Sequence, residues 1–183
     1  MTRRNPSPPR AVLGGFVGED SSSLQGQIWD ALTRVPDPEI PAVSVADMGM
    51  IETVEVRDGR ARVVVLPTFT GCPAIPVIKD DVAAAVAAVE GVDEVEVEFS
   101  FDPPWTTDRI TEEGRAKLRD FGLAPPTGKG PVLVADIGLP TVALCPFCGS
   151  RNTVNENPFG PTPCRALYYC NDCRNPFEQF KPI

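Results

Sequence analysis

The sequence predicts an α+β domain with the element order α-β-β-α-β-α, followed by a small four-cysteine module of the zinc-ribbon type. Three observations predict this: alternating apolar runs around an Asp-Gly pair, segments with helical spacing of apolar residues, and five of the six cysteines gathered near the C-terminus. We expect a disordered arm (1–23), an α+β domain (24–125), a linker (126–140) and a ribbon (141–183).

The first predicted elements are a helix and a hairpin. Leu24, Ile28 and Leu32 recur at helical spacing after serines that can cap the helix, and prolines at 36 and 38 stop it. Val54 and Val56 then alternate with charged residues up to Asp58-Gly59, a strong signal for a two-residue turn, and an apolar run follows as the returning strand.

The second half of the domain repeats the pattern of helix and strand. Residues 72–92 predict a helix with Pro73 in its first turn and Gly91 just past its end. Residues 93–101 alternate valine with glutamate, as a half-buried strand does. The last helix is expected to be capped by Thr107 and ended by Gly122. Within the linker, 132–134 can form a further strand.

Composition and charge exclude several classes of function. The net charge is −8, which disfavours a nucleic-acid partner because such proteins carry a basic face. No apolar run is long enough to span a membrane, and the glycine-broken N-terminal patch is a poor signal peptide, so we expect a cytoplasmic protein without membrane partners. In that compartment, cysteines indicate metal or redox chemistry rather than disulfides.

The C-terminal cysteines have the spacing of a metal site. Two CxxC pairs, separated by about the length of a hairpin, can close a tetrahedral four-sulfur site, and its ligands are Cys145, Cys148, Cys170 and Cys173. Zinc is favoured, although ligand type alone leaves iron or an iron–sulfur cluster open. Cys164 is either a buried small hydrophobe or an extra ligand of this site.

Cys72 stands apart from the ribbon, between a predicted strand and a predicted helix. The positive end of the helix dipole should favour its thiolate. The sequence contains no histidine, so a cysteine nucleophile with a histidine base is disfavoured. The acidic segment 37–49 supplies Asp37, Glu39 and Asp47, whose carboxylates could join a thiolate in holding a metal. The alternative is that Cys72 is only a helix cap.

Part of this pattern resembles a known family. Residues 24–100 are similar to the MIP18 family, whose members assist iron–sulfur cluster assembly and share an Asp-Pro-Glu turn, an Asp-Leu-Gly strand entry and a Thr-x-x-x-Cys-Pro helix start. Met48 replaces the usual leucine, and the other matching positions are Asp37, Pro38, Glu39, Asp47, Gly49, Cys72 and Pro73. The resemblance implies that Cys72 and the three carboxylates take part in transfer of iron or a cluster.

The remaining segments resemble the PaaD family (also called PaaJ), accessory proteins of the phenylacetyl-CoA epoxidase system. The similarity rests on "DPPWTTDRITEEGRAKLRDFGLAPP", "CPFCGSRNT", "FGPTPCRALYYCNDC" and "PFEQFKPI". A cysteine in the third of these matches Cys164, which strengthens its reading as a ligand. The epoxidase system contains a di-iron oxygenase and a reductase that carries flavin and a [2Fe–2S] centre.

The resemblance to PaaD implies a non-enzymatic factor that helps to mature an iron or iron–sulfur centre of that epoxidase in aerobic phenylacetate catabolism. Implied cofactors are zinc or iron at the four cysteines and a transient iron–sulfur cluster. Implied partners are the oxygenase and reductase subunits or iron–sulfur assembly proteins. The alternative is a non-catalytic structural subunit with a purely structural ribbon. An open sheet edge leaves a homodimer as a further expectation.

Overall fold

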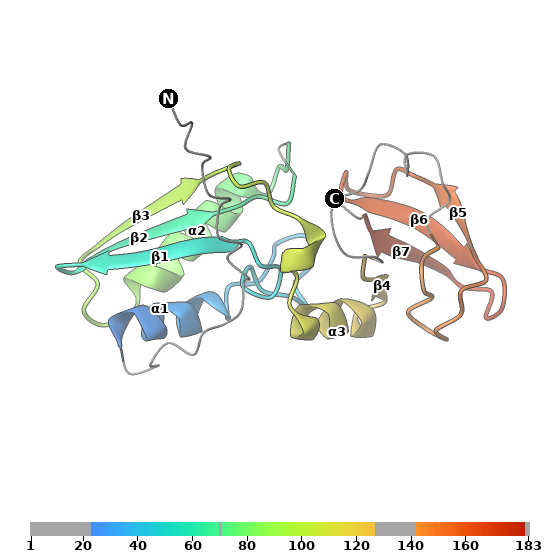
Figure 1. The fold of residues 1–183 in the computed structure, drawn as a ribbon, viewed down its shortest axis with the longest axis horizontal. Helices are drawn as coiled ribbons and strands as arrows, with labels where there is room; N and C mark the ends of the chain where they lie inside the picture. Colours follow the sequence, from blue (N-terminus) through green and yellow to red (C-terminus); the bar gives the residue numbers. More distant parts are fainter. Residues whose placement is uncertain (1–22, 70, 127–141, 182–183) are drawn as a thin grey trace, which may run out of the picture.

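The computed structural model describes residues 23–69, 71–126 and 142–181. These residues form two sheets, with strand orders β1-β2-β3 and β4-β7-β6-β5. Figure 1 shows the sheets at opposite ends of the molecule, with α3 (Glu112–Asp120) between them. The predicted α+β domain followed by a four-cysteine module is confirmed. Most of the predicted arm and linker, including the predicted strand at 132–134, lies outside the described residues.

The N-terminal sheet is built from a hairpin and a parallel crossover. Strands β1 (Ile51–Arg57) and β2 (Arg60–Val65) are antiparallel. Asp58 and Gly59 between them have φ values of 48° and 76°, so both turn residues are left-handed, as the predicted turn requires. Strand β3 (Glu94–Phe99) then pairs in parallel with β2, with Val63 opposite Val97.

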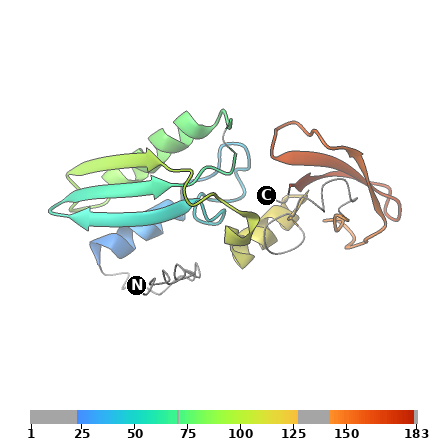
Figure 2. The same ribbon diagram turned by 45° about the horizontal axis from the view of Figure 1, so that its top comes forward.

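Two helices pack together against this sheet (Figures 1 and 2). Helix α1 (Leu24–Leu32) contacts β1 and α2 (Ile75–Ala87), and α2 contacts β3, so both helices cover the same face. Ser23 caps α1, with its hydroxyl accepting from the Gly26 amide at 3.0 Å. The apolar side chains that the helices bury are Ile28, Leu32, Ile78, Val82 and Val86, each contributing about 1.5–3 kcal/mol of transfer free energy.

Two helix starts differ from their predicted positions. Helix α2 begins at Ile75, so Pro76 occupies its first turn and Pro73 precedes it. A helix beginning at Pro73 would need an amide hydrogen at position 76, which proline lacks. The last helix begins at Glu112 rather than after Thr107, which instead opens the 3-10 turn η1 (Thr107–Arg109).

The C-terminal sheet contains a strand from the other side of the linker. Strands β5 (Thr153–Asn157), β6 (Arg165–Cys170) and β7 (Pro176–Phe180) are antiparallel neighbours. Strand β4 (Leu123–Ala124), which follows α3, pairs in parallel with β7. The ribbon is therefore joined to the N-terminal domain by a strand pairing as well as by the chain.

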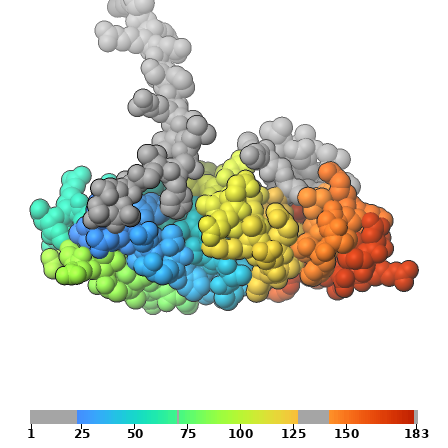
Figure 3. Space-filling view, turned by 90° about the horizontal axis from the view of Figure 1, so that it is seen from below, coloured from blue at the N-terminus to red at the C-terminus, as the bar shows by residue number. Residues whose placement is uncertain are grey.

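Side chains of the ribbon also enter the core of the first domain. Phe180 and Cys164 belong to the same buried cluster as the residues between α1, α2 and the N-terminal sheet. The ring of Phe180 meets Trp105 edge-on, with 5.9 Å between centroids, and the Trp105 indole donates to the Met48 carbonyl at 2.8 Å. Figure 3 shows the α3 region, in yellow, filling the space between the two parts. None of the helices described is long and apolar enough to cross a membrane.

Candidate metal centre and thiol–carboxylate site

The four cysteines predicted as ligands meet in the ribbon. Their sulfur atoms all lie within 4.8 Å of one another, and two of the sulfur pairs, Cys145 with Cys173 and Cys148 with Cys170, are each 3.6 Å apart. Tetrahedral coordination with zinc–sulfur bonds of about 2.3 Å requires sulfur–sulfur distances of about 3.8 Å. The donor set and its spacing therefore fit a four-coordinate metal ion such as zinc.

Each CxxC pair lies on a tight turn of the backbone. The Gly149 amide donates to the Cys145 carbonyl at 2.9 Å, and the Arg174 amide donates to the Cys170 carbonyl at 2.9 Å. Both turns close through a residue with left-handed φ, 73° at Gly149 and 60° at Arg174. Two such turns facing each other bring the four sulfurs together.

The side chain of Asp172 ties the two cysteine turns together. It accepts hydrogen bonds from the Ser150 hydroxyl and from the Asn152 amide group, the latter at 2.7 Å. These bonds to the charged form lower the pKa of Asp172. The signal for this role lies in the sequence, where an aspartate follows Cys170 by two residues, but a lone polar residue in a knuckle is too common to single out.

Cys164 is not part of the four-sulfur group. Its side chain is buried, and its Sγ lies 3.1 Å from the Thr162 hydroxyl and 4.0 Å from Glu39 Oε2 of the N-terminal domain. Burial is the main cause of a raised pKa for this thiol, and the Glu39 carboxylate raises it further. The structure places this cysteine with the acidic turn rather than with the ribbon cysteines.

The acidic turn is shaped by Asp37. Its Oδ1 accepts hydrogen bonds from the amides of Glu39 and Ile40, at 2.8 and 2.9 Å. Burial nevertheless raises the pKa of this carboxyl, against the opposing effect of those two bonds. The turn leaves the Glu39 carboxylate directed toward Cys164.

Asp47 makes a different set of contacts. Its Oδ2 accepts from the Ser44 amide at 2.8 Å and from the Lys117 ammonium at 2.9 Å, which ties the loop to α3. Gly49 has φ 62°, and a Cβ there would collide with the Arg109 carbonyl oxygen. The Asp-Met-Gly stretch thus joins the loop to the segment that leads to the ribbon.

Cys72 lies in the turn before α2 and is half buried, packed against the main core cluster. Its pKa is raised, first by burial and then by the charges of Glu39, Asp37 and Cys164, while a hydrogen bond with the Ala74 backbone opposes them. The predicted bias toward thiolate is therefore wrong. The helix begins three residues later than Cys72, and the charges that act on the thiol are acidic.

Arg165 was not predicted from the sequence. Its guanidinium donates to the Glu39 backbone carbonyl at 2.6 Å and to Glu178 Oε2 at 3.0 Å, and its Nε is buried without a hydrogen-bond partner among the described residues. Its charge also lowers the pKa of Asp37 against the effect of burial. Only the docking of the ribbon brings this residue to the acidic turn, so no local pattern could have indicated it.

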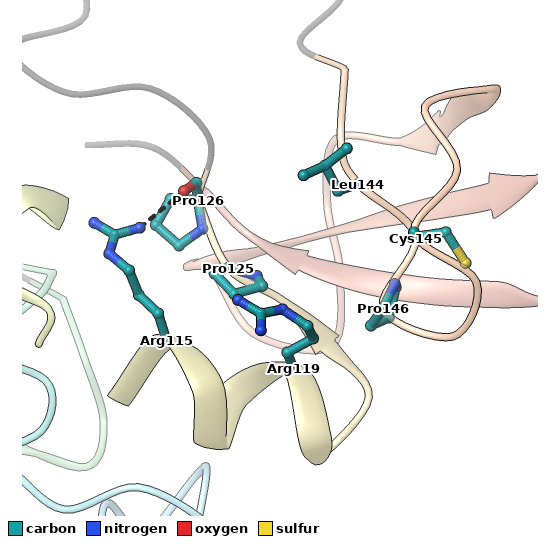
Figure 4. Close-up of a pocket in the computed structure, with 8 residues that line it drawn as sticks. Arg115, Arg119, Pro125, Pro126, Leu144, Cys145 and Pro146 are labelled. Carbon is teal, nitrogen blue, oxygen red and sulfur yellow. Dashed lines mark hydrogen bonds between the residues drawn. The ribbon is translucent and has the colours of Figure 1, made fainter. Parts of the chain in front are cut away.

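A separate hollow lies where α3 meets the first cysteine turn (Figure 4). It is lined by Arg115 and Arg119 on one side and by Pro125, Leu144 and Pro146 on the other. Arg115 donates to the carbonyls of Pro126, at 3.0 Å, and Thr107, at 2.6 Å. Its guanidinium therefore holds the segment around β4 against α3.

Two families match successive parts of the chain. The family described as an iron–sulfur cluster assembly protein matches residues 25–99, and the family described as the PaaD zinc beta ribbon domain matches residues 130–181. The first range contains Cys72 and the acidic turn. The second contains the four clustered cysteines and Cys164.

Individual proteins show the same two-part similarity. A protein of Escherichia coli (strain K12) whose name makes it a component of 1,2-phenylacetyl-CoA epoxidase is 38% identical over 86% of this chain and 92% of its own length. The Fe–S protein maturation auxiliary factor YitW of Bacillus subtilis (strain 168) is 33% identical over 52% of this chain and 94% of its own.

A solved structure supports the fold of the first domain. The crystal structure of a domain of unknown function (DUF59) from Bacillus anthracis covers 52% of this chain and 91% of its own, with 27% identity and a TM-score of 0.50. The similarity to the epoxidase protein, in contrast, runs through both domains. The chain therefore belongs to the PaaD family, in which an iron–sulfur cluster assembly domain precedes a zinc β-ribbon.

Proposed function

We propose that this protein is a cytoplasmic accessory factor that assists assembly of an iron or iron–sulfur centre in a phenylacetyl-CoA epoxidase complex during aerobic phenylacetate catabolism. The observation that carries the proposal is the grouping of a half-buried thiol, Cys72, with the charges of Glu39 and Asp37. Thiolate and carboxylate together suit iron, which accepts both sulfur and oxygen ligands.

Within this site the residues would have different tasks. Cys72 supplies the thiolate that binds the incoming iron, and Glu39 supplies an oxygen ligand. Asp37 and Asp47 shape the loop, because their carboxylates bind backbone amides and Lys117. Since the raised pKa keeps Cys72 protonated, iron has to displace a proton before the bond forms, which favours reversible binding.

The ribbon would have a structural and docking role. We assign zinc to its four cysteines because their closed sulfur set leaves no position for a further ligand. Its position beside the first domain would allow it to bring the oxygenase or reductase subunit of the epoxidase to Cys72. Catalysis itself then belongs to the partner subunits.

The test is anaerobic transfer of iron or cluster to the reductase component. The full chain, with its ribbon loaded with zinc, is reconstituted with Fe(II) and sulfide, and the wild type is compared with Cys72→Ser. We expect the variant to lose about tenfold or more of the transferred iron, because a direct ligand is removed, while its zinc content stays the same.

Equal transfer by the two proteins would contradict the proposal. It would then favour the alternative, a structural subunit with a purely structural ribbon. That alternative predicts stoichiometric co-purification with the oxygenase that does not depend on Cys72.

A further inference from the structure

The docked ribbon brings a second thiol to the acidic turn. Cys164 comes from the segment just before β6, far from Cys72 along the chain, yet both pack in the same hydrophobic cluster. Glu39 links them: its Oε2 lies 4.0 Å from the Cys164 sulfur, and its charge acts on Cys72 as well. Two thiols and a carboxylate thus gather from three separate segments.

We propose that Cys164 is the second thiol ligand of the iron or cluster held at Cys72, with Glu39 as the oxygen ligand, so that the transfer site spans both domains. The inference rests on the proposed function. On binding, each thiol releases a proton to solvent as its sulfur forms a bond to iron, and no electron is transferred. On release, thiolates of the client replace the two sulfurs, which take up protons again.

The charges around this site can be balanced by Arg165. Two thiolates and one carboxylate carry three negative charges, and Fe(II) supplies two positive ones. The guanidinium of Arg165, held against the Glu39 carbonyl, supplies the remaining positive charge. Its buried Nε has no acceptor among the described residues, and a charged ligand set nearby would compensate for that loss.

The hydroxyl of Thr162 gives further support to Cys164 as a ligand. Its Oγ1 lies 3.1 Å from the Cys164 sulfur, and this bond opposes the effect of burial on the thiol pKa. A hydroxyl donating to sulfur stabilises the thiolate more than the thiol. A cysteine serving only as a buried hydrophobe would not need such a donor.

The spacing of this set differs from that of the ribbon. Within the described part of the chain, the ribbon cysteines are the single group of three or more potential ligands with all donor atoms within 4.8 Å. The thiol–carboxylate set is therefore more open than a structural metal site. An open set leaves coordination positions that incoming client thiolates can occupy, as a carrier requires.

The inference is tested by Fe(II) binding to the zinc-loaded full chain under anaerobic conditions. Wild type is compared with Cys72→Ser, Cys164→Ser and the double variant. The control, Ala166→Ser, places the same hydroxyl at a buried position of the ribbon's own core. We expect each cysteine variant to lose about tenfold or more in Fe(II) affinity, and the control to bind as the wild type does.

The outcomes separate the two proposals. Loss of affinity in Cys72→Ser alone, with Cys164→Ser like the wild type, would overturn the present inference and leave the proposed function standing. No iron bound by the wild type beyond the ribbon would overturn both.

A second measurement needs no variant and so does not depend on how a variant folds. Co(II) is added to the wild type whose ribbon is already filled with zinc, and the sulfur-to-cobalt charge-transfer absorption is measured. The intensity of two thiolates is expected. The intensity of a single thiolate would rule out Cys164 as a ligand.

Discussion

At the scale of single residues, Cys72 retains its proton because its surroundings are apolar and acidic. Burial and the charges of Glu39 and Asp37 disfavour a thiolate there and raise the pKa of the thiol. A metal ion reverses this balance, since carboxylates that repel a thiolate attract a cation. The same groups that make Cys72 a poor nucleophile can therefore make it part of a metal site.

This balance predicts the effect of removing one negative charge. In Glu39→Gln, the pKa of Cys72 should fall, so alkylation of Cys72 by iodoacetamide at pH 8 should be faster than in the wild type. In both proteins the rate should rise with pH, because only the thiolate reacts. Peptide mapping by mass spectrometry of the zinc-loaded protein measures the rate at this one cysteine.

A charge that lies farther away provides the control for that experiment. Glu94→Gln removes a carboxylate that pairs with Arg60 at the exposed end of the sheet, and it should leave alkylation of Cys72 unchanged. A rate in Glu39→Gln equal to or below that of the wild type would contradict the assigned influence of Glu39 on the thiol.

The residue scale also shows what a sequence can and cannot indicate. The ribbon cysteines were predictable because a CxxC turn is local, and two of them close one site. The pKa of Cys72 was not, since it depends on where α2 begins and on charges from a distant loop. The surroundings of Cys164 and Arg165 depend on domain docking, which no local spacing encodes.

At the scale of elements, the start of α3 decides how the loop at Asp47 is held. The Thr111 hydroxyl accepts from the Gly114 amide at 2.9 Å, and the Thr111 amide donates to the Asp47 carbonyl at 2.9 Å. Lys117, farther along the helix, reaches the Asp47 carboxylate. The helix therefore begins where the cap and the acidic loop meet, and the capping threonine lies one turn after the one predicted from the sequence.

Removing this cap gives a prediction about stability. Thr111→Ala should lower the free energy of unfolding by about 1 kcal/mol, since the Gly114 amide loses its acceptor. Thr106→Ala is the matched control, because Thr106 precedes η1 without a capping bond from its side chain. Chemical denaturation followed by circular dichroism compares the two, and equal losses would contradict the assignment of the cap.

The element order itself followed from periodicity, whereas the boundaries did not. Alternating valines and the Asp-Gly turn predicted the N-terminal sheet, because a half-buried strand leaves a local pattern of period two. Strand β4, only two residues long, leaves no such pattern. It exists because β7 offers it a free edge, so its prediction required knowledge of the tertiary structure.

At the scale of the whole molecule, the ribbon acts as part of the first domain's core. Phe180 is almost fully buried against Trp105, and β4 pairs with β7 across the junction. A module of this size depends on its metal to fold, because it buries little apolar surface of its own. The metal in the ribbon should therefore stabilise the surroundings of Trp105 in the other domain.

This coupling predicts the result of removing the metal. Chelation should unfold the ribbon, withdraw Phe180 and expose Trp105, whose side chain is only 4% exposed in the folded protein. In a Trp29→Phe background, where Trp105 is the sole tryptophan, the emission should shift to longer wavelength on chelation and return on addition of zinc. In Trp105→Phe, which reports from Trp29 in α1, the shift should be absent. Loss of metal and ribbon structure without any change in Trp105 emission would show that the two parts are independent, because burial of Phe180 is worth about 1.5–3 kcal/mol only while the ribbon is docked.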